Sequence, residues 1–290
     1  MKPVSAFGTT FQNPILLAAG TAGFGREIEG VVDLESLGGI VTKAVSPEPR
    51  AGHPAPRVAE FSGGMLNAVG LANPGLEHVV QHELPWLEVN LRRARLLVNV
   101  VGSTIDDFVA VVERLDRFAV VTAFELNLSC PNTERGGEEF SADSAVLASL
   151  VSCCRRATAK PLVVKLGPSL PDVAAAAKVA EENGADGFSL VNTLPSERHD
   201  FRSSDGDPAA RLGFGKGGVS GPALLQLGLE VVSRVRERTP LPIIGIGGIS
   251  TYGDLERYLA AGATLVAVGT AALADPRVPG RLVREWARRG

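Results

Sequence analysis

The chain has 290 residues, of which 45% are hydrophobic and 21% charged, and its formal net charge is −3. This composition supplies a large apolar core, and the small negative charge gives no bulk attraction to nucleic acid, which we exclude as a partner. The three cysteines, Cys130, Cys153 and Cys154, are too few for a disulfide framework or an iron–sulfur cluster, so a reducing cytoplasm fits the chain best.

The N-terminal residues lack the apolar run of a signal peptide, so we expect a soluble protein. Residues 4–11 alternate around Gly8 and predict a short hairpin that plugs a larger fold. Residues 15–20 are a continuous apolar run that ends in a glycine-rich turn, which is typical of a parallel strand buried on both faces. A helix is expected over 29–37, and the strand predicted over 39–44 places Lys43 at its carboxyl end.

Two irregular insertions interrupt the chain. Residues 45–73 are rich in proline and glycine, and we expect a structureless segment that acts as a lid or wall. Residues 194–218 are polar and charged and predict a second long loop. Within this loop, residues 213–218 match G-x-G-x-x-G, but no buried strand precedes them, so a Rossmann dinucleotide site is rejected.

Apart from these insertions, strand and helix patterns alternate along the whole chain. Strands are predicted at 15–20, 39–44, 96–102, 120–126, 161–167, 186–193, 241–248 and 264–270. Helices are predicted at 29–37, 74–90, 103–116, 142–158, 171–183, 222–238, 252–261 and 279–288. The alternation predicts an α/β fold, a single (β/α)8 TIM barrel domain over residues 1–290, with a doubly wound open sheet as the alternative. The apolar stretch 259–274 is interrupted by glycines and threonines, so no membrane segment is expected.

Residues 127–132 place a thiol between carboxamides directly after a predicted strand. Pro131 biases Cys130 away from helical backbone angles, so the strand should end there and leave the thiol on a loop. Cys130 could act as a nucleophile, a metal ligand, a proton acceptor or a core residue. Its polar neighbours, Asn127, Ser129 and Asn132, favour a functional loop over a buried packing position.

Further polar and glycine positions also fall at predicted strand ends, where barrel enzymes carry their chemistry. Gly247, Gly248, Gly269 and Thr270 follow the last two strands, a common phosphate-binding position, and predict a phosphorylated ligand. Lys43 and Lys165 supply cations on the same rim. The four histidines form no ligand cluster, so no metal site is expected, and Cys153 and Cys154 are interpreted as packing residues.

Together, these motifs resemble the class 1 dihydroorotate dehydrogenases over nearly the whole chain. The motifs that carry the resemblance stand, in collinear order, at 42–44, 48–50, 65–71, 73–75, 127–132, 164–166, 192–193, 217–222 and 247–249. The resemblance implies an FMN-dependent oxidation of dihydroorotate to orotate in pyrimidine biosynthesis. It also implies that Cys130 is the base at substrate C5 while hydride passes from C6 to flavin N5.

The resemblance further assigns binding roles to individual residues. Lys43 would lie between substrate and flavin, and Lys165 would place a cation at the pyrimidine side of the flavin. The implied substrate-binding residues are Lys43, Asn67, Gly70, Leu71, Asn127, Asn132, Asn192 and Thr193. The implied FMN-binding residues are Ala19, Gly20, Lys43, Ala44, Asn127, Lys165, Val191, Ser220, Gly221, Gly247, Gly248, Gly269 and Thr270.

Segments 48–57 and 132–140 resemble the class 1B branch in particular. That resemblance implies a homodimer that works with a separate FAD and iron–sulfur subunit passing electrons to NAD, whereas a class 1A enzyme would reduce fumarate by itself. Residues 194–200 replace the Gly-Met type turn that is usual after Asn192-Thr193, and His53 replaces a more usual Asn. A related flavin enzyme acting on another dihydropyrimidine or cyclic amide, and a non-catalytic barrel that binds a phosphorylated ligand, remain as alternatives.

Overall fold

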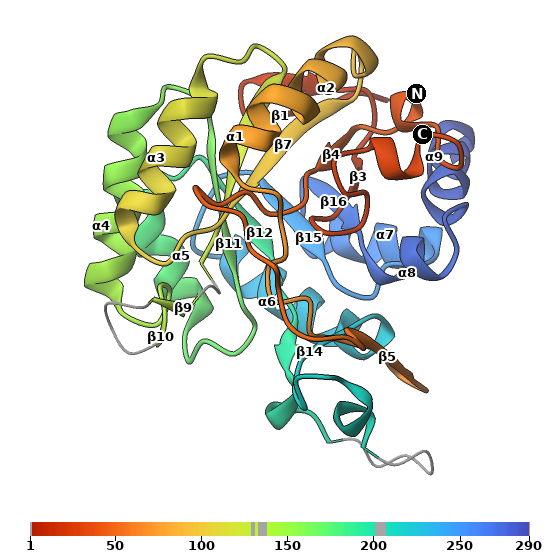
Figure 1. Ribbon diagram of the computed structural model, residues 1–290. Helices are drawn as coiled ribbons and strands as arrows, with labels where there is room; N and C mark the ends of the chain where they lie inside the picture. Colours follow the sequence, from red (N-terminus) through yellow and green to blue (C-terminus); the bar gives the residue numbers. More distant parts are fainter. Residues whose placement is uncertain (1, 129–130, 133–137, 201–206, 290) are drawn as a thin grey trace.

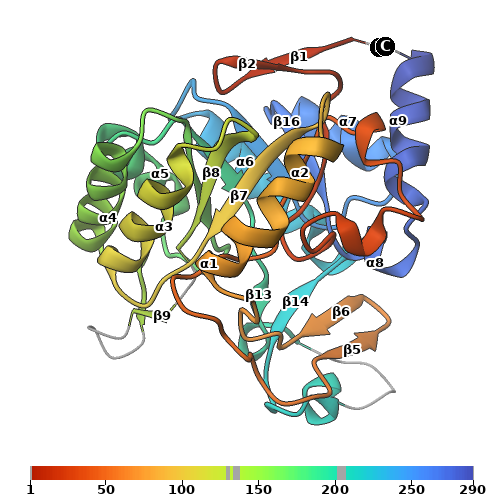
Figure 2. The same ribbon diagram turned by 45° about the horizontal axis from the view of Figure 1, so that its top comes forward.

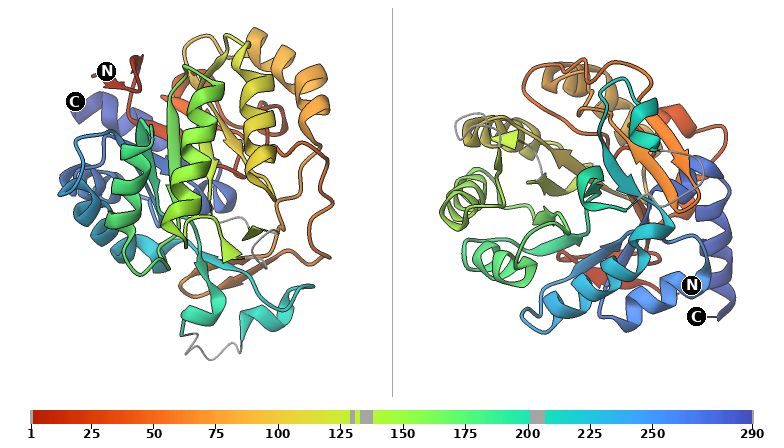
Figure 3. Two further views of the ribbon diagram at one scale, coloured as in Figure 1. Left: turned by 90° about the vertical axis from the view of Figure 1, so that its left-hand side faces the viewer. Right: turned by 90° about the horizontal axis from the view of Figure 1, so that it is seen from below.

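The structure is a computed structural model that describes residues 2–128, 131–132, 138–200 and 207–289, with only the backbone described at 131, 132 and 138. Its centre is a closed ring of parallel strands, seen obliquely in Figure 1 and along its axis in the right-hand view of Figure 3. The barrel strands are β3 Ile15–Leu17, β4 Gly39–Val41, β7 Arg95–Val100, β8 Val121–Asn127, β11 Leu162–Leu166, β12 Gly187–Leu190, β15 Ile243–Ile246 and β16 Leu265–Val268.

Pairing between the last and the first barrel strands decides between the two predicted architectures. β16 pairs with β3 in parallel, with Val266 opposite Ile15 and Val268 opposite Leu17. This contact closes the ring, so the TIM barrel is confirmed and the open sheet is wrong. All eight predicted strands are present, each shorter than or shifted by a few residues from its predicted bounds.

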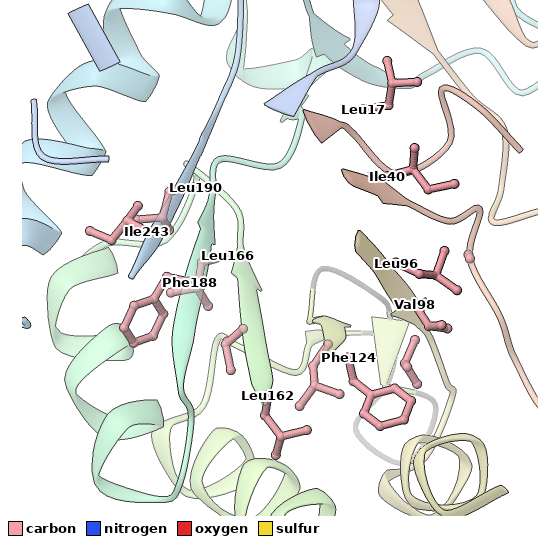
Figure 4. Packing of buried hydrophobic residues seen from close by; sticks show 14 of the residues in the cluster. Leu17, Ile40, Leu96, Val98, Phe124, Leu162, Leu166, Phe188, Leu190 and Ile243 are labelled. Atoms are coloured by element: carbon pink, nitrogen blue, oxygen red, sulfur yellow. The ribbon is translucent and has the colours of Figure 1, made fainter. Parts of the chain in front are cut away.

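Helices surround the ring and bury the outward-facing side chains of its strands. Figure 4 shows part of this apolar layer, including Phe124, Leu162 and Phe188, which are all fully buried. The helical segments are α1 Leu76–His78, the π-helical turn η3 Val79–Glu83, α2 Leu84–Asn90, α3 Ile105–Asp116, α4 Ser144–Ala157, α5 Val173–Glu182, α6 Leu225–Arg236, α7 Tyr252–Ala260, α8 Thr270–Ala274 and α9 Val278–Arg289. Seven of the predicted helices are confirmed, whereas the short α8 was not predicted.

The helix predicted over 29–37 is wrong. Two 3-10 turns, η1 Arg26–Ile28 and η2 Leu34–Ser36, stand in this region instead. The Glu35 carboxylate accepts hydrogen bonds from the backbone N–H groups of Arg92, Arg93 and Ala94, which ties η2 to the loop before β7. These long-range bonds outweigh the weak local helix propensity of a segment that contains Gly30, Val31 and Val32.

The N-terminal hairpin closes one end of the barrel, as predicted. β1 Val4–Ala6 and β2 Thr9–Phe11 pair antiparallel, and Figure 2 shows them lying across the upper end of the ring. Phe7 and Phe11 pack in one cluster with interior barrel residues such as Leu16, Val163 and Ile244. The hairpin therefore excludes water from the amino ends of the strands.

The two long insertions meet at the opposite end of the barrel. β5 Val58–Phe61 and β6 Gly64–Asn67 form a hairpin, and β14 Gly218–Ser220 pairs with β6, while β13 Leu194–Pro195 pairs with β14 (Figure 2). The expectation of a structureless segment over 45–73 is therefore wrong. Its strands are stabilised by a partner about 150 residues further along the chain, which no local pattern reveals.

Within the described part of the chain, no helix combines the length and the apolar character needed to cross a bilayer.

Candidate active site

The barrel interior changes from apolar to polar toward the carboxyl ends of its strands. Side chains alternate along a strand, so Asn99, Glu125 and Lys165 face inward with the interior residues Leu97, Ala123 and Val163, which stand two positions earlier. Ser189 on β12 stands opposite Lys165. Four neighbouring strands thus contribute one layer of polar side chains, on the carboxyl side of the interior apolar cluster.

These four side chains form a connected network around the carboxylate of Glu125. Asn99 Nδ2 donates to Glu125 Oε1 at 2.7 Å, and Ser189 Oγ donates to Oε2 at 2.6 Å. Lys165 Nζ lies 3.4 Å from Oε1. Glu125 is 0% and Lys165 5% exposed. A buried charge is tolerated only when it is paired and hydrogen-bonded, and here both conditions are met.

Sequence reasoning identified Lys165 but missed Glu125 and Asn99. Both lie inside predicted strands, at 120–126 and 96–102, and were counted only as part of apolar runs. The signal that could have found them is the alternation of side chains along a strand. Each residue stands two positions beyond an interior apolar residue, so each must point into the barrel. A charged side chain in that position requires a partner, and Lys165 is the nearest cation by register.

Above this layer, a pair of carboxamides spans the mouth of the barrel. Asn192 Nδ2 donates to Asn127 Oδ1 at 3.1 Å, and Asn192 Oδ1 accepts from the backbone N–H of Thr193 at 2.9 Å. The backbone of Asn192 is itself fixed, because its N–H donates to Leu166 O. Val191, which precedes it, is buried. These amides offer both donors and acceptors at one place.

The small antiparallel sheet lies against this carboxamide pair. Asn67 Nδ2 donates to Gly218 O at 3.2 Å, and a Cβ placed on Gly218 would stand only 2.2 Å from Thr193 Oγ1. Thr193 is therefore in close contact with β14. Gly70 and Leu71 follow β6 in left-handed conformations, with φ of 67° and 56°. The predicted substrate residues Asn67, Asn127, Asn192 and Thr193 are thus brought together from three segments.

A second group of predicted residues, rich in glycine and hydroxyls, follows β14, β15 and β16. Thr270 Oγ1 donates to Ser220 Oγ at 2.8 Å, and Ser220 Oγ donates to Met65 O at 3.1 Å. Gly221, Gly247 and Gly248 all have positive φ, which a side chain would strain. The short helix α8 begins directly after β16, in the place where phosphate sites of this fold often have an extra helix.

The loop after β15 is held from beneath by a buried tyrosine. Tyr258 Oη lies 3.0 Å from Ile246 O and 2.9 Å from Gly247 O, within donating distance of both carbonyls. A Cβ on Gly228 would stand 2.0 Å from this hydroxyl, and one on Gly245 would stand 2.4 Å from the ring. Burial raises the pKa of Tyr258, so the hydroxyl stays protonated and keeps donating.

The ends of β3 and β4 complete the rim. Ala18 N–H donates to Val268 O, so Ala19 and Gly20 emerge beside Gly269. Gly20 has open space at its Cβ position, and at Gly269 the nearest atom, Ala18 Cβ, is 3.6 Å away.

The loop after β4 is tied to the same rim. Thr42 Oγ1 accepts from the Asn99 backbone N–H at 3.1 Å, which joins this loop to the polar layer. Lys43 is half-buried and anchored by its own backbone N–H, which donates to Gly23 O at 2.7 Å. Ala44 is buried behind it.

Two predicted site residues are not placed. Cys130 lies outside the described residues, and for Asn132 only the backbone is described, in the short strand β9 Pro131–Asn132 that pairs with β10 Glu138–Glu139. The role predicted for Cys130 therefore stays a prediction.

The remaining candidates lie elsewhere. His53 stacks on Phe214 at 3.7 Å between ring centroids, and exposed His78 contacts Glu83 at 3.2 Å. Cys154 is fully buried in the apolar layer, as predicted, whereas Cys153 is half-buried. Over the described ranges, no group of three or more histidine, cysteine or acidic residues is arranged to hold a metal ion.

The site combines a glycine- and hydroxyl-rich end with an end that carries an ammonium group and carboxamides. Positive-φ glycines and two hydroxyls stand at one side, while a buried ammonium group and two carboxamides stand at the other. Open space at Gly20 and Gly269 lies where a bound group would contact the rim. This donor set fits a phosphorylated cofactor with a heterocyclic ring next to a small amide-bearing substrate.

Comparisons with known proteins agree with this geometry. A family model described as "Dihydroorotate dehydrogenase" matches residues 1–289. A protein of Listeria monocytogenes serotype 4b named "Dihydroorotate dehydrogenase B (NAD(+)), catalytic subunit" is 43% identical over 282 residues, which cover 97% of this chain and 91% of the relative. A protein of the same name from Geobacillus kaustophilus is 45% identical over 271 residues, which cover 93% and 85%.

A solved structure shows the same likeness in three dimensions. It is a crystal structure of DHODH in complex with ferulenol from Eimeria tenella. It superposes with a TM-score of 0.81 and 26% sequence identity, and the match covers 98% of this chain and 82% of that one.

Proposed function

This chain belongs to the dihydroorotate dehydrogenase family, the flavin-dependent enzymes that oxidise dihydroorotate to orotate in pyrimidine biosynthesis, and from this premise we propose that it uses FMN held at the polar end of the barrel. One observation carries the proposal. Three pairs of contacting polar side chains stand at the carboxyl ends of the barrel strands. They are Lys165–Glu125, Asn127–Asn192 and Ser220–Thr270. In this proposal, the whole chain is a single flavin-binding domain.

The residues divide between the two parts of the cofactor. Ser220, Thr270 and the backbone of Gly221, Gly248 and Gly269 would hold the phosphate and ribityl chain, because glycines let N–H groups approach oxygens closely. The remaining proposed contacts to the flavin ring come from Ala19, Gly20, Lys43, Ala44, Asn127, Lys165, Val191 and Gly247. When bound, FMN accepts the hydride that leaves C6 of dihydroorotate.

The substrate ring would lie against the carboxamide pair. Asn67, Asn127, Asn132 and Asn192 can together serve the N–H and C=O groups of the dihydropyrimidine. Thr193, Gly70 and Leu71 would close the pocket, and Lys43 would stand between substrate and cofactor.

Proton transfer is assigned to the thiol. The Cys130 thiolate would take the proton from C5 while hydride leaves C6, so that the C5–C6 bond becomes the double bond of orotate. The thiol would then lose this proton to the solvent.

The test is anaerobic mixing of the purified protein with dihydroorotate while the flavin absorption is recorded. We expect a yellow protein that is bleached, and the released cofactor should coelute with FMN. Bleaching by another dihydropyrimidine, but not by dihydroorotate, would reassign the substrate. A colourless protein that cannot be reconstituted with FMN would favour a phosphorylated-ligand binder instead.

We further propose that the chain works as a homodimer with a second subunit that carries FAD and an iron–sulfur cluster. The name of the relatives, "Dihydroorotate dehydrogenase B (NAD(+)), catalytic subunit", supports a partner chain and NAD. The homodimer, the FAD and the cluster follow from the resemblance of segments 48–57 and 132–140 to the class 1B branch. A barrel with no more than three cysteines cannot hold a four-thiolate cluster itself.

A further inference from the structure

The buried carboxylate of Glu125 has no part in the reaction proposed above, yet it is the centre of the polar layer. It comes from β8 and contacts side chains of β7, β11 and β12. An acid that is 0% exposed in a barrel interior needs a reason, because an apolar residue would pack there at lower cost.

The distances show which partners fix the carboxylate. Its bonds from Asn99 (2.7 Å) and Ser189 (2.6 Å) are short and come from neutral, well-buried donors. The approach of Lys165 Nζ, at 3.4 Å, is longer than the usual 2.7–2.9 Å of a tight charged pair. Asn99 and Ser189 therefore hold the carboxylate, and the ammonium group keeps hydrogens for a further acceptor.

Hydrogen bonding alone does not require a charged residue at position 125. A glutamine could accept from Asn99 or Ser189 and donate in return. What only the carboxylate supplies is a negative charge beside a lysine that is 5% exposed. Without that charge, the buried ammonium group would lose the partner that offsets the cost of its burial.

The position of Lys165 connects this pair to the site. Lys165 stands in register with Asn127, whose side chain contacts Asn192 at the barrel mouth. Lys165 thus belongs to the buried network and stands beside the strand residue that contributes to the carboxamide pair.

We infer that Glu125 is a positioning residue: anchored by Asn99 and Ser189, it holds the Lys165 ammonium group in place for the flavin. This inference rests on the proposed function, because it assigns Lys165 to the flavin ring. Glu125 itself touches neither substrate nor cofactor.

The test is a double-variant comparison of the midpoint potential of the bound flavin, measured without substrate. Lys165→Met should lower the potential in the wild-type background, because the reduced flavin loses a nearby cation. In the Glu125→Gln background the lysine is no longer held in place, so Lys165→Met should lower the potential much less.

The comparison within each background cancels the effect of the charge at position 125 itself. Among the described residues, Glu125 is the carboxylate within ion-pair distance of Lys165, while Asn99, Asn127 and Ser189 are neutral. The two proteins of each pair share the same residue at position 125, so the difference between them reports the contribution of Lys165 alone.

A matched control removes a carboxylate from the opposite end of the same strands. Asp186 accepts from Arg155 at 2.7 Å and from the Leu162 backbone N–H at 2.8 Å. Asp186→Asn should lower the melting temperature but leave the effect of Lys165→Met on the potential unchanged.

A second variant covers the case in which Glu125→Gln does not fold. Ser189→Ala removes one of the two donors that anchor the carboxylate but leaves its charge, so it should also reduce the effect of Lys165→Met on the potential. If Lys165→Met has the same effect in either folded, FMN-loaded background as in the wild type, the inference is overturned. If the wild type neither binds FMN nor is bleached by dihydroorotate, the proposed function fails instead.

Discussion

At the residue scale, the proposed chemistry depends most on Cys130. We predict that Cys130→Ala retains FMN but slows flavin reduction by dihydroorotate by roughly 10² to 10⁴, the usual contribution of a positioned base. Stopped-flow mixing under anaerobic conditions measures this rate. Raising the pH should not restore it, since alanine has no proton acceptor. Reduction at the wild-type rate would return Cys130 to a packing role.

Another residue-scale prediction concerns stability at alkaline pH. Burial raises the pKa of the Cys154 thiol from 9.0 to about 12. The folded protein therefore keeps a proton that the unfolded chain loses above about pH 9. The free energy of unfolding should fall as pH rises from about 9 toward 12, by at most about 1.4 kcal/mol per pH unit from this group.

Urea unfolding at about pH 8 and about pH 10 tests the contribution of Cys154 to this slope. Cys154→Ala should be less stable than the wild type at both pH values, because it leaves a cavity, but should lose less stability between them. Leu150→Ala is the matched control, since it leaves a cavity under the same helix without removing a titratable group, and it should keep the wild-type pH dependence. Equal slopes in the wild type and Cys154→Ala would contradict the prediction.

At the element scale, the contact between β14 and the loop after β12 shapes the proposed substrate pocket. A Cβ on Gly218 would stand 2.2 Å from Thr193 Oγ1 and 2.7 Å from Thr193 Cβ. We predict that Gly218→Ala displaces Thr193 and lowers kcat/KM for dihydroorotate roughly ten- to hundredfold, mainly through KM. FMN content should stay close to that of the wild type.

Gly253→Ala provides the control for this steric argument. Gly253 lies in the first turn of α7, where an added Cβ meets nothing closer than Thr251 Oγ1 at 3.7 Å. This variant should match the wild type in KM and should be slightly more stable, because alanine favours helix. A Gly218→Ala enzyme with unchanged KM would show that Thr193 does not border the substrate.

At the scale of the whole molecule, the open question is where the electrons go. We predict that the isolated chain turns over slowly with fumarate, quinone or NAD, and reduces NAD rapidly only after its FAD and iron–sulfur subunit is added. Parallel steady-state assays with the three acceptors measure this, and sedimentation of the isolated chain checks for a dimer. Rapid fumarate reduction by the chain alone would make it a class 1A enzyme that needs no partner.

The sequence by itself determined the barrel and the identity of most proposed site residues. Apolar runs such as 15–20 and 161–167 are local signals of buried parallel strands, and eight of them in alternation leave few topologies. Lys165, Asn127 and Asn192 stand at strand ends, and the parallel arrangement alone brings such ends to one side.

The tertiary structure decided what depends on contacts between distant segments. Local sequence patterns could not predict that β6 pairs with β14, or that residues 29–37 form no helix. In both cases the hydrogen-bond partners are far away in the chain. The same holds for Glu125, which looked like part of an apolar strand. The order in which β7, β8, β11 and β12 pair puts Asn99, Lys165 and Ser189 around its carboxylate, and burial then turns an ordinary acid into the charge partner of the lysine.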